Sequence, residues 1–422
     1  MKPGAVPGWR ESLRAAWAAF WPSRLIVFGT AIWVTVADLP ANTQPDYPKL
    51  SHPFTNWPGS GLLDLLFSPL AKWDALHYLA ISLDGYVEAQ PGLPPADVRP
   101  AFFPLYPGAV HVLSGFGASP GLVLIMAYLF SLAAFLVALV LMHRLAVLEI
   151  GELHARTALM LLAFFPFAFF FGLPYTESLF LLLALAVFLV AREGRWALVG
   201  VSLALASATR VPGLLLFVPA LLIYLYGPRS DQPERPSRGW RPRYPLRWDA
   251  AWLLLVPIGL LAYSAYLHFT LGDALQWQQA QELFGRHTVD PFTGAWHGLR
   301  AAGESVGTVL EGRYDEQPIY YHLDIAQVAL VAVAVAAGTA MLRNLPIAYG
   351  SWVLVSLVPI FVSQPGDNPL FSAGRFISVL FPIFFWLARV CDRRGSTQTV
   401  VTLSAAAMAV LTAEFALWSF VS

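Results

Sequence analysis

The sequence predicts an all-α polytopic membrane protein. Of the 422 residues, 57% are hydrophobic and only 12% are charged, and the mean hydropathy is +0.59. These values are too apolar for a soluble domain and suit a chain whose helices are surrounded by lipid. Acidic and basic residues are equal in number, so the formal net charge is zero and does not indicate a nucleic-acid partner.

Apolar stretches recur along the whole chain and are separated by short polar turns. Because a spanning helix needs ~20 mostly apolar residues, we expect about eleven transmembrane helices in a single membrane domain over residues 1–422. The first stretch follows an amphipathic segment and lacks a small-residue cleavage site, so we expect a retained helix and not a signal peptide. The expected spans are residues 22–38, 120–142, 156–173, 176–191, 196–208, 212–227, 250–269, 323–342, 345–363, 374–391 and 398–420.

The distribution of basic residues sets the orientation, since short cytoplasmic loops are enriched in Lys and Arg. Residues 102–116 are ambiguous, because a helix of roughly 22 Å is short of a ~30 Å hydrocarbon core. If this segment lies along the outer interface without crossing, every basic cluster falls on the inner side. Those clusters are Lys2 with Arg10 and Arg14, residues 143–156, Arg192 with Arg195, the six arginines of residues 229–247, Arg343, and Arg393 with Arg394.

This orientation gives two long outer loops, residues 39–119 and 270–322, which we expect to carry short interfacial helices, and a basic cytoplasmic loop at 228–249. Arg greatly outnumbers Lys, a bias typical of GC-rich bacterial genomes. We therefore expect a multi-pass protein of a bacterial plasma membrane with its active site on the extracytoplasmic face. Polar residues that would be unfavourable in lipid then gather at that face, and they are Asp74, Glu177, Arg210 and Arg375.

An acidic motif lies in the first outer loop, where residues 73–78 read W-D-A-L-H-Y. Asp74 has a structural reading as the N-cap of a helix. It also has a functional reading, because an acid held beside a bilayer is a candidate site residue. Asp74, His77 and Tyr78 fall within one helical turn, and Trp73 can anchor that helix at the interface. We therefore favour the functional reading.

Two aromatic or acidic patterns also have both readings. Phe102, Phe103 and Tyr106 could form an interfacial aromatic belt, or a wall that guides an isoprenoid tail. Glu177 follows Thr176 at a helix start, where Thr176 could cap the helix and Glu177 could meet its positive end. In the functional reading, Glu177 opens onto the outer cavity.

Arg210 and Arg375 could be snorkelling anchors at helix ends. On the outer side, however, the orientation rule does not favour arginine, so a phosphate-binding role is the better prediction. The histidines show no metal-ligand spacing, and Cys391 is the single cysteine, which excludes an intrachain disulfide and a cysteine-based metal cluster. We expect no metal and no other cofactor.

Together these motifs resemble the PIG-V family, which contains the second mannosyltransferase of GPI-anchor assembly and many bacterial relatives. The chain differs from the eukaryotic pattern in an insert at residues 88–100 and in the residues around Arg210. The matching segments are residues 73–86, 101–107 and 175–180, Arg210 with Gly213, and, more weakly, residues 272–281, 374–376 and 381–382.

The resemblance implies a GT-C fold and an inverting glycosyltransferase that takes mannose from a polyprenyl- or dolichyl-phosphate donor. Such a reaction needs a base for the acceptor hydroxyl, for which we expect Asp74, and cations for the departing phosphate, for which we expect Arg210 and Arg375. The expected partners are the lipid bilayer, this donor, and a glycolipid or glycan acceptor. The residues expected to orient the sugar or the acceptor are Trp73, His77, Tyr78, Tyr175, Glu177 and Gln281.

Two other classes of function stay open. A carrier or flippase for lipid-linked sugars would line a path with its acids and arginines near the bilayer midplane, whereas here they cluster at one face. A non-catalytic membrane subunit would tolerate asparagine in place of Asp74.

Overall fold

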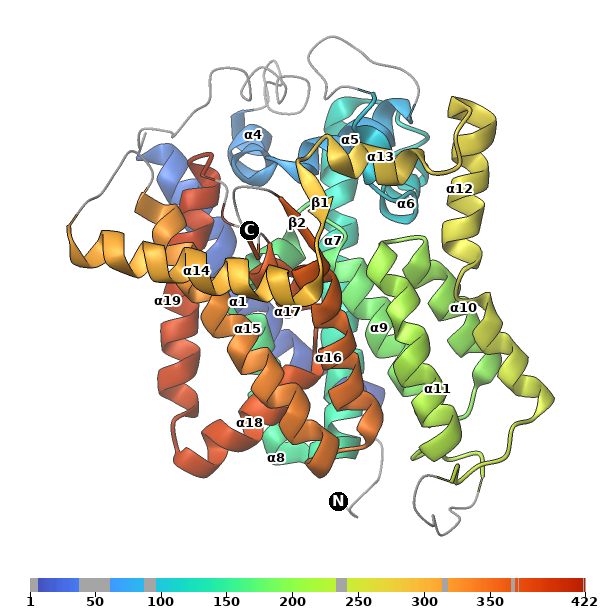
Figure 1. Cartoon of the computed structure of the whole chain (residues 1–422). Coiled ribbons are helices and arrows are strands. Elements are labelled where there is room, and N and C mark those ends of the chain that lie inside the picture. Colours follow the sequence, from blue (N-terminus) through green and yellow to red (C-terminus); the bar gives the residue numbers. More distant parts are fainter. Residues whose placement is uncertain are drawn as a thin grey trace.

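The computed structural model describes residues 7–37, 61–86, 96–232, 241–312, 318–365, 369–370, 372–419 and 421. Most of this part of the chain is helical, and the two strands have three residues each (Figure 1). The predicted loops at 39–119 and 228–249 are therefore covered only in part, because residues 38–60, 87–95 and 233–240 lie outside the described residues.

The elements follow one another with short connections. The α-helices are α1 (Trp9–Val36), α4 (Gly61–Phe67), α5 (Asp74–Asp84), α6 (Leu105–Leu113), α7 (Pro120–Ile150), α8 (Glu152–Ala163), α9 (Glu177–Arg192), α10 (Trp196–Ser207), α11 (Phe217–Tyr226), α12 (Ile258–Leu271), α13 (Gln276–Glu282), α14 (Pro291–Leu310), α15 (Pro318–Asn344), α16 (Ile347–Val362), α17 (Ala373–Ser378), α18 (Pro382–Arg394) and α19 (Thr397–Ala416). The 3-10 helices are η1 (Ser68–Leu70), η2 (Arg99–Ala101), η3 (Pro166–Gly172), η4 (Val211–Leu216) and η5 (Trp248–Leu255), and the strands are β1 (Arg286–Thr288) and β2 (Ser363–Pro365).

Four described helices are long and apolar enough to cross a membrane, namely α1, α7, α15 and α19. The number rises to six if each of two bent pairs is one span, α8 with η3 at 79° and η5 with α12 at 41°. The other predicted spans coincide with shorter helices such as α9, α10 and α16, and residues 374–391 break into α17 and α18. The predicted apolar segments are thus helical, while the predicted number of spans is not established.

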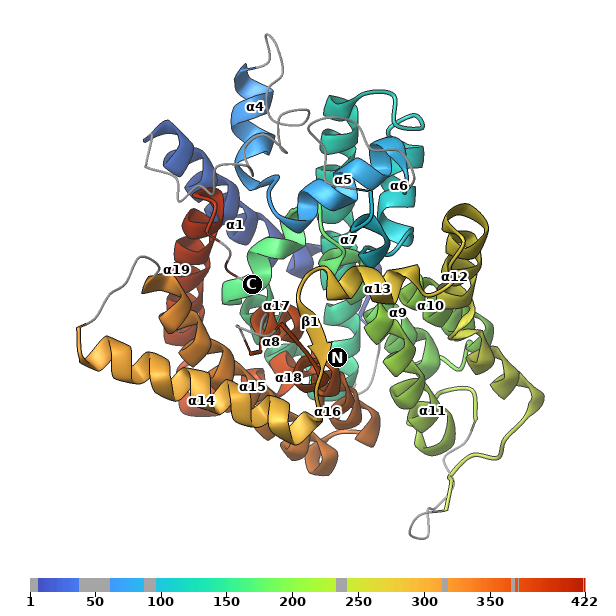
Figure 2. The ribbon, with the colours of Figure 1, turned by 45° about the horizontal axis from the view of Figure 1, so that its top comes forward.

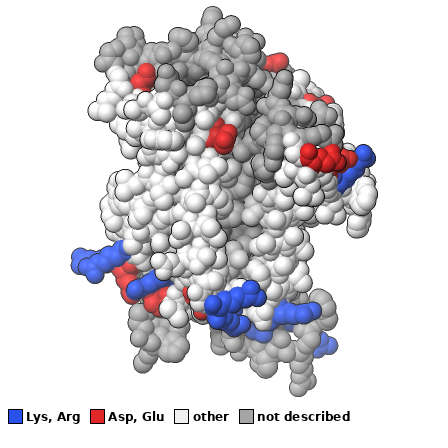
Figure 3. Space-filling view, turned by 90° about the vertical axis from the view of Figure 1, so that its left-hand side faces the viewer, with Lys and Arg blue, Asp and Glu red and all other residues white. Residues whose placement is uncertain are grey.

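Charged side chains are unevenly distributed over the surface. Most of the Lys and Arg side chains visible in Figure 3 lie toward the end that is at the bottom of Figure 1, and a broad belt of uncharged side chains lies above them. The N-terminal end of the described chain, α8 and α18 lie at this lower end, whereas α5, α6 and α13 lie at the upper end (Figure 1). This polarity is the one that the distribution of basic residues predicted.

α7 is central to the packing and contacts α1, α5, α6, α8 and α9. Ser119 fixes its start, since the Ser119 hydroxyl accepts a hydrogen bond from the N–H of Leu122 and Pro120 occupies the first helical position. Residues 102–116 form only the nine-residue α6, which packs against α5 and α7 and is too short to cross a membrane.

α14 runs across α15 and α16 instead of alongside them (Figures 1 and 2). Asp290 caps α14 by accepting hydrogen bonds from the N–H groups of Phe292 and Thr293. Small residues face the neighbouring helices and large apolar residues face outward. The buried residues are Gly294, Gly298, Ala302 and Ser305, and the exposed ones are Phe292, Trp296, Leu299, Val306 and Leu310.

A two-stranded antiparallel ribbon joins the second predicted outer loop to the end of α16. β1 pairs with β2 so that Arg286 lies opposite Pro365, His287 opposite Gln364 and Thr288 opposite Ser363. β1 directly precedes α14, and β2 lies shortly before α17 in the chain. The ribbon therefore places two distant parts of the sequence at the same site.

Candidate active site

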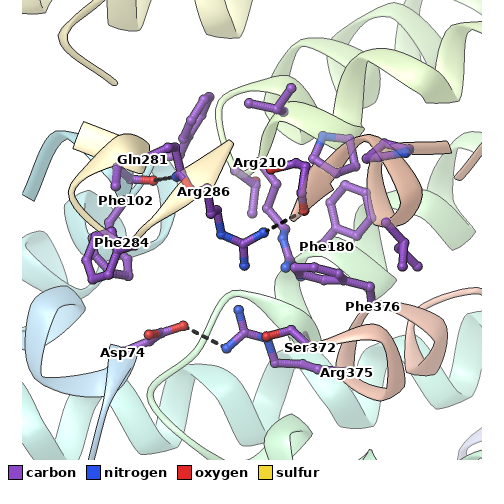
Figure 4. Close-up of a pocket in the computed structure, with 18 of the residues that line it drawn as sticks. Asp74, Phe102, Phe180, Arg210, Gln281, Phe284, Arg286, Ser372, Arg375 and Phe376 are labelled. Atoms are coloured by element: carbon purple, nitrogen blue, oxygen red, sulfur yellow. Dashed lines mark hydrogen bonds and ion pairs between the residues drawn. The ribbon is translucent and has the colours of Figure 1, made fainter. Parts of the chain in front are cut away.

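A cavity of about 1040 Å³ lies between the helices of the two predicted outer loops and α9, α16 and α17. One part of its lining is charged, and Figure 4 shows Asp74, Arg210, Arg286 and Arg375 around a common open space. Another part of the lining is apolar. A volume of this size can hold a ligand with a sugar, a phosphate and part of a hydrocarbon chain.

Asp74 enters the cavity from a strained turn. Trp73, the N-cap residue of α5, has φ 57° and ψ −126°, a conformation that costs a residue other than glycine about 1–3 kcal/mol. Asp74 is the first residue of α5, and no side-chain hydrogen bond caps the helix. The structural reading of Asp74 as an N-cap is therefore wrong, because Trp73 occupies that position and the Asp74 carboxylate points elsewhere.

The C-terminal end of α19 supports this turn. The Lys72 ammonium donates a hydrogen bond to the carbonyl of Ala416 and lies 4.7 Å above the ring of Trp418. Trp73 packs edge-on against Trp418, with ring centroids 5.9 Å apart. From the other side, the Tyr175 hydroxyl donates a hydrogen bond to the carbonyl of Lys72 at 3.1 Å. These contacts hold Trp73 in a conformation that it would not keep alone.

Four charged side chains form a network beside the cavity. Arg375 donates from Nη1 to Asp74 Oδ2 at 2.7 Å, and its Nε lies 3.1 Å from Glu177 Oε1. Arg210 donates from Nη1 to the same Glu177 oxygen at 3.0 Å. Glu177 is 1% exposed and lies behind the two arginines, while Asp74 is 22% exposed and lines the cavity. Glu177 is thus a shared counter-ion, and Asp74 is the acid that a ligand can reach.

Two glycines bring the arginines to this network. A Cβ at Gly213 would lie 2.2 Å from the carbonyl oxygen of Ala206, so η4, which follows Arg210, packs closely on α10. A Cβ at Gly374 would lie 2.3 Å from the ring of Phe167, so α17 packs closely on η3. A larger residue at either position would clash with these atoms, so the close packing beside each arginine depends on glycine.

The charges fix the ionisation of Asp74. Burial opposes the charged form, but the charge and hydrogen bond of Arg375 outweigh it, so the pKa of Asp74 lies below its usual value. Burial lowers the pKa of His77 to about 4. At neutral pH, Asp74 is therefore a carboxylate and His77 a neutral imidazole.

His77 and Gln281 line the cavity beside Asp74, as the sequence predicted. His77 stacks on Phe102, with ring centroids 4.5 Å apart, and its buried Nδ1 has no hydrogen-bond partner among the described residues. Gln281 donates from Nε2 to the carbonyl of Ala101 at 3.1 Å. Trp73, Tyr78, Phe102 and Phe103 also line the cavity.

Three predicted site residues lie outside the lining formed by the described residues. Tyr106 is 1% exposed and bonds to the carbonyl of Ala127 and to Ser131, so it packs α6 on α7 and cannot guide a lipid tail. Tyr175 is equally buried and supports the Lys72 turn. Glu177 cannot orient a sugar hydroxyl, because the two arginines cover it. In this structure the contacts of all three residues give structural or electrostatic support beside the cavity.

The apolar part of the lining includes one face of α16. Trp352, Ser356 and Ile360 recur every four residues and lie on one side of the helix. Phe180, Val379 and Leu380 from α9 and the region of α17 complete this wall. The side chains that suit a hydrocarbon chain thus come mainly from α16 and its neighbours.

Residues 27–221 match the family model described as Mannosyltransferase (PIG-V). The predicted resemblance to PIG-V is confirmed. The matched segment contains Asp74, Glu177 and Arg210, whereas Arg375 lies beyond it.

Further comparisons add little to the PIG-V match. The crystal structure of the Archaeoglobus fulgidus oligosaccharyltransferase complex with Zn and sulfate is similar with a TM-score of 0.39 and 11% sequence identity, over 93% of this chain and 53% of that chain. The chain thus spans about half of the length of that protein, and this level of similarity does not establish a shared fold. No curated protein matches the chain.

Sequence reasoning missed two cations of the site, Lys72 and Arg286. Lys72 is adjacent to the PIG-V motif but is buried, and burial lowers its pKa to about 7. Arg286 lies in the second predicted outer loop, where the orientation rule does not favour arginine, so the sequence held a signal for it. The orientation rule alone does not distinguish Arg286 from Arg99 and Arg300, which also lie in the predicted outer loops. No group of three His, Cys, Asp or Glu side chains that could hold a metal ion occurs among the described residues.

Proposed function

We propose that this chain is an inverting glycosyltransferase that moves mannose from a polyprenyl- or dolichyl-phosphate donor to a hydroxyl of a lipid- or protein-linked glycan. The observation that carries the proposal is the Asp74 carboxylate, which faces a cavity lined by three arginines and by an apolar wall. The PIG-V match supports glycosyltransferase activity. The reaction takes place at the extracytoplasmic face of a bacterial plasma membrane and involves no metal.

Asp74 accepts the proton of the acceptor hydroxyl in this proposal. The hydroxyl oxygen forms a bond to the anomeric carbon, the bond from that carbon to the phosphate oxygen breaks, and the lipid phosphate leaves with the electron pair. A carboxylate paired with Arg375 is a weak base, which suits a late proton transfer, since the acceptor oxygen becomes strongly acidic once it bonds to carbon. A single displacement of this kind inverts the anomeric centre.

Arg375 and Arg210 have different tasks in this scheme. Arg375 is engaged by both Asp74 and Glu177, so its main effect is to hold Asp74 ionised and oriented. Arg210 gives Nη1 to Glu177 and lines the cavity, so the remaining N–H groups of its guanidinium can reach a phosphate. Neutral His77 and Gln281 supply hydrogen-bonding groups for the sugar or the acceptor.

The hydrocarbon chain of the donor binds along α16 in this scheme. Trp352, Ile360 and Leu380 give an apolar surface next to the charged part of the cavity. Phe102 and Phe103 line the cavity as well and keep their proposed contact with the chain near the sugar. This arrangement places the phosphate between an apolar wall and the acid, as a lipid-phosphate donor requires.

Transfer of labelled mannose tests the proposal. The purified protein in lipid nanodiscs is incubated with labelled polyprenyl-phosphate mannose and with glycolipids extracted from host membranes. We expect a labelled mannoside and one equivalent of polyprenyl phosphate. A lipid-linked sugar carrier would bind the donor and move it across a vesicle membrane without either product, and that result would replace our proposal.

A further inference from the structure

The charged part of the cavity contains more cations than the carboxylates of its network can neutralise. Three guanidinium groups, those of Arg210, Arg286 and Arg375, line the same space (Figure 4). The carboxylates of Asp74 and Glu177 contact Arg375 and Arg210 at 2.7 to 3.1 Å. Glu282 also lines the cavity, but it is an exposed residue.

Among the described residues, Arg286 is the cation of this group that forms no ion pair with an acid. No carboxylate of the described residues forms an ion pair with Arg286, whose one hydrogen bond within that part of the chain goes from Nη1 to the carbonyl of Ser363 at a long 3.5 Å. Burial and the neighbouring charges of Arg375 and Arg210 together lower the pKa of Arg286 to about 10, although Asp74 acts in the opposite direction. Arg286 stays protonated but lies in an unfavourable environment.

The ribbon keeps Arg286 in this environment. Arg286 lies opposite Pro365 in the β1–β2 pair, and the carbonyl that it contacts belongs to β2. A flexible loop would let the side chain turn toward water, whereas backbone pairing fixes its Cα over the cavity. A half-buried cation that lies near two other cations is stabilised when an anion binds among them.

We propose that Arg286 is the main ligand of the donor phosphate. The inference rests on the proposed function and deepens it: the ligand class is a lipid-linked phosphate, either the sugar phosphodiester of the donor or the isoprenyl monophosphate that is released. Arg210 adds a second contact, and Arg375 positions Asp74 without carrying the phosphate. A planar guanidinium can donate two parallel hydrogen bonds to phosphate oxygens, which a lysine cannot do.

Binding of a short isoprenyl monophosphate to the full chain in nanodiscs tests this assignment. Arg286→Gln should weaken binding by about 10- to 100-fold, the usual effect of losing a charge-assisted hydrogen bond to an ionised group. Arg286→Lys should lie in between, because it keeps the charge and loses the fork. The control is Arg300→Gln, since Arg300 lies in the same predicted loop, is 69% exposed and pairs with Glu304. This control should bind like the wild type.

Thermal melting without ligand separates a binding role from a structural role. Because Arg286 lies near the charges of Arg375 and Arg210 and forms no ion pair within the described part of the chain, Arg286→Gln should melt at the same temperature as the wild type or higher. A lower melting temperature, or a variant that does not fold, would show that Arg286 supports the fold and would overturn the inference. Unchanged affinity of Arg286→Gln for the isoprenyl phosphate would overturn it equally.

Two further ligands identify the source of the phosphate. Inorganic phosphate should bind weakly and GDP-mannose should not compete, because neither has a hydrocarbon chain for the wall along α16. Tight, Arg286-dependent binding of GDP-mannose would overturn the assignment to a lipid phosphate. If the wild type itself does not bind the isoprenyl phosphate, the proposed function fails; if the wild type binds and Arg286→Gln binds equally, only the role of Arg286 fails.

Discussion

Asp74→Asn is the substitution that most directly tests the proposed chemistry. Asparagine has nearly the same shape as aspartate, and no helix cap is lost, because Trp73 is the N-cap residue of α5. The change removes the proton acceptor and one half of the ion pair with Arg375. It leaves Arg375 in contact with Glu177.

The structure gives two different magnitudes for this change. Removing one partner of a fully buried ion pair costs about 3–5 kcal/mol, but Asp74 is 22% exposed and Arg375 keeps a second acid, so we expect about 1–3 kcal/mol of lost stability. Loss of a positioned general base slows turnover by ~10²–10⁴-fold, or about 3–5 kcal/mol of barrier. The effect on turnover should therefore exceed the effect on folding.

The assay measures mannose transfer at saturating donor, donor affinity and thermal melting in the same nanodisc preparation. Transfer should fall ~10²–10⁴-fold. Donor affinity should stay or improve, because the substitution removes a negative charge from the neighbourhood of the phosphate. Asp84→Asn, at the other end of α5 and outside the cavity lining, is the matched control and should transfer at the wild-type rate. Transfer by Asp74→Asn that falls only with the folded fraction would refute the assignment of Asp74 as the base.

Three further outcomes are expected. Arg375→Gln should move the acid limb of the pH profile of kcat to higher pH, because Arg375 holds the pKa of Asp74 below its usual value and burial alone raises it. If the acid limb does not move, Arg375 does not set the pKa of Asp74. In the wild type, the stabilising effect of the Asp74 carboxylate is present above the pKa of the unfolded chain and is lost as pH falls through the lower folded value. Trp418→Ala should lower kcat and leave donor affinity unchanged, because it loosens the turn that carries Asp74; an equal change in both would contradict a positioning role. Cysteines at Ala118 and Ser230, both exposed, should react with an impermeant thiol reagent from opposite sides of the membrane, and labelling from one side would exclude the predicted topology.

Much of the local structure could be predicted from the sequence, because local patterns determine it. The apolar run that begins at Pro120 gave a long helix, and the length of residues 102–116 correctly excluded a span there. The outer placement of charges grouped Asp74, Arg210 and Arg375, which do lie together in the structure. These predictions needed only the composition and length of each apolar segment and the alternation of successive loops between the two sides of the membrane.

The pairings inside the site could not be predicted in the same way. Glu177 was expected to face a ligand, but its position depends on Arg210 and Arg375, which are 33 and 198 residues away in the sequence. The place of Arg286 depends on the pairing of two three-residue strands, which carry too little signal to be recognised. The number of spans was not established, because α9, α10 and α16 are shorter than the helices that are long enough to cross a membrane.

The contact of Lys72 and Trp73 with the end of α19 has a consequence for biosynthesis. Asp74 leaves the ribosome long before Arg375, Ala416 and Trp418 are made. Until then the acid lacks its partner Arg375, and the turn before it lacks the contacts that Ala416 and Trp418 supply. The geometry around Asp74 thus arises only after α19 has been made, and until then the Asp74 carboxylate lacks the surroundings that it has in the folded protein.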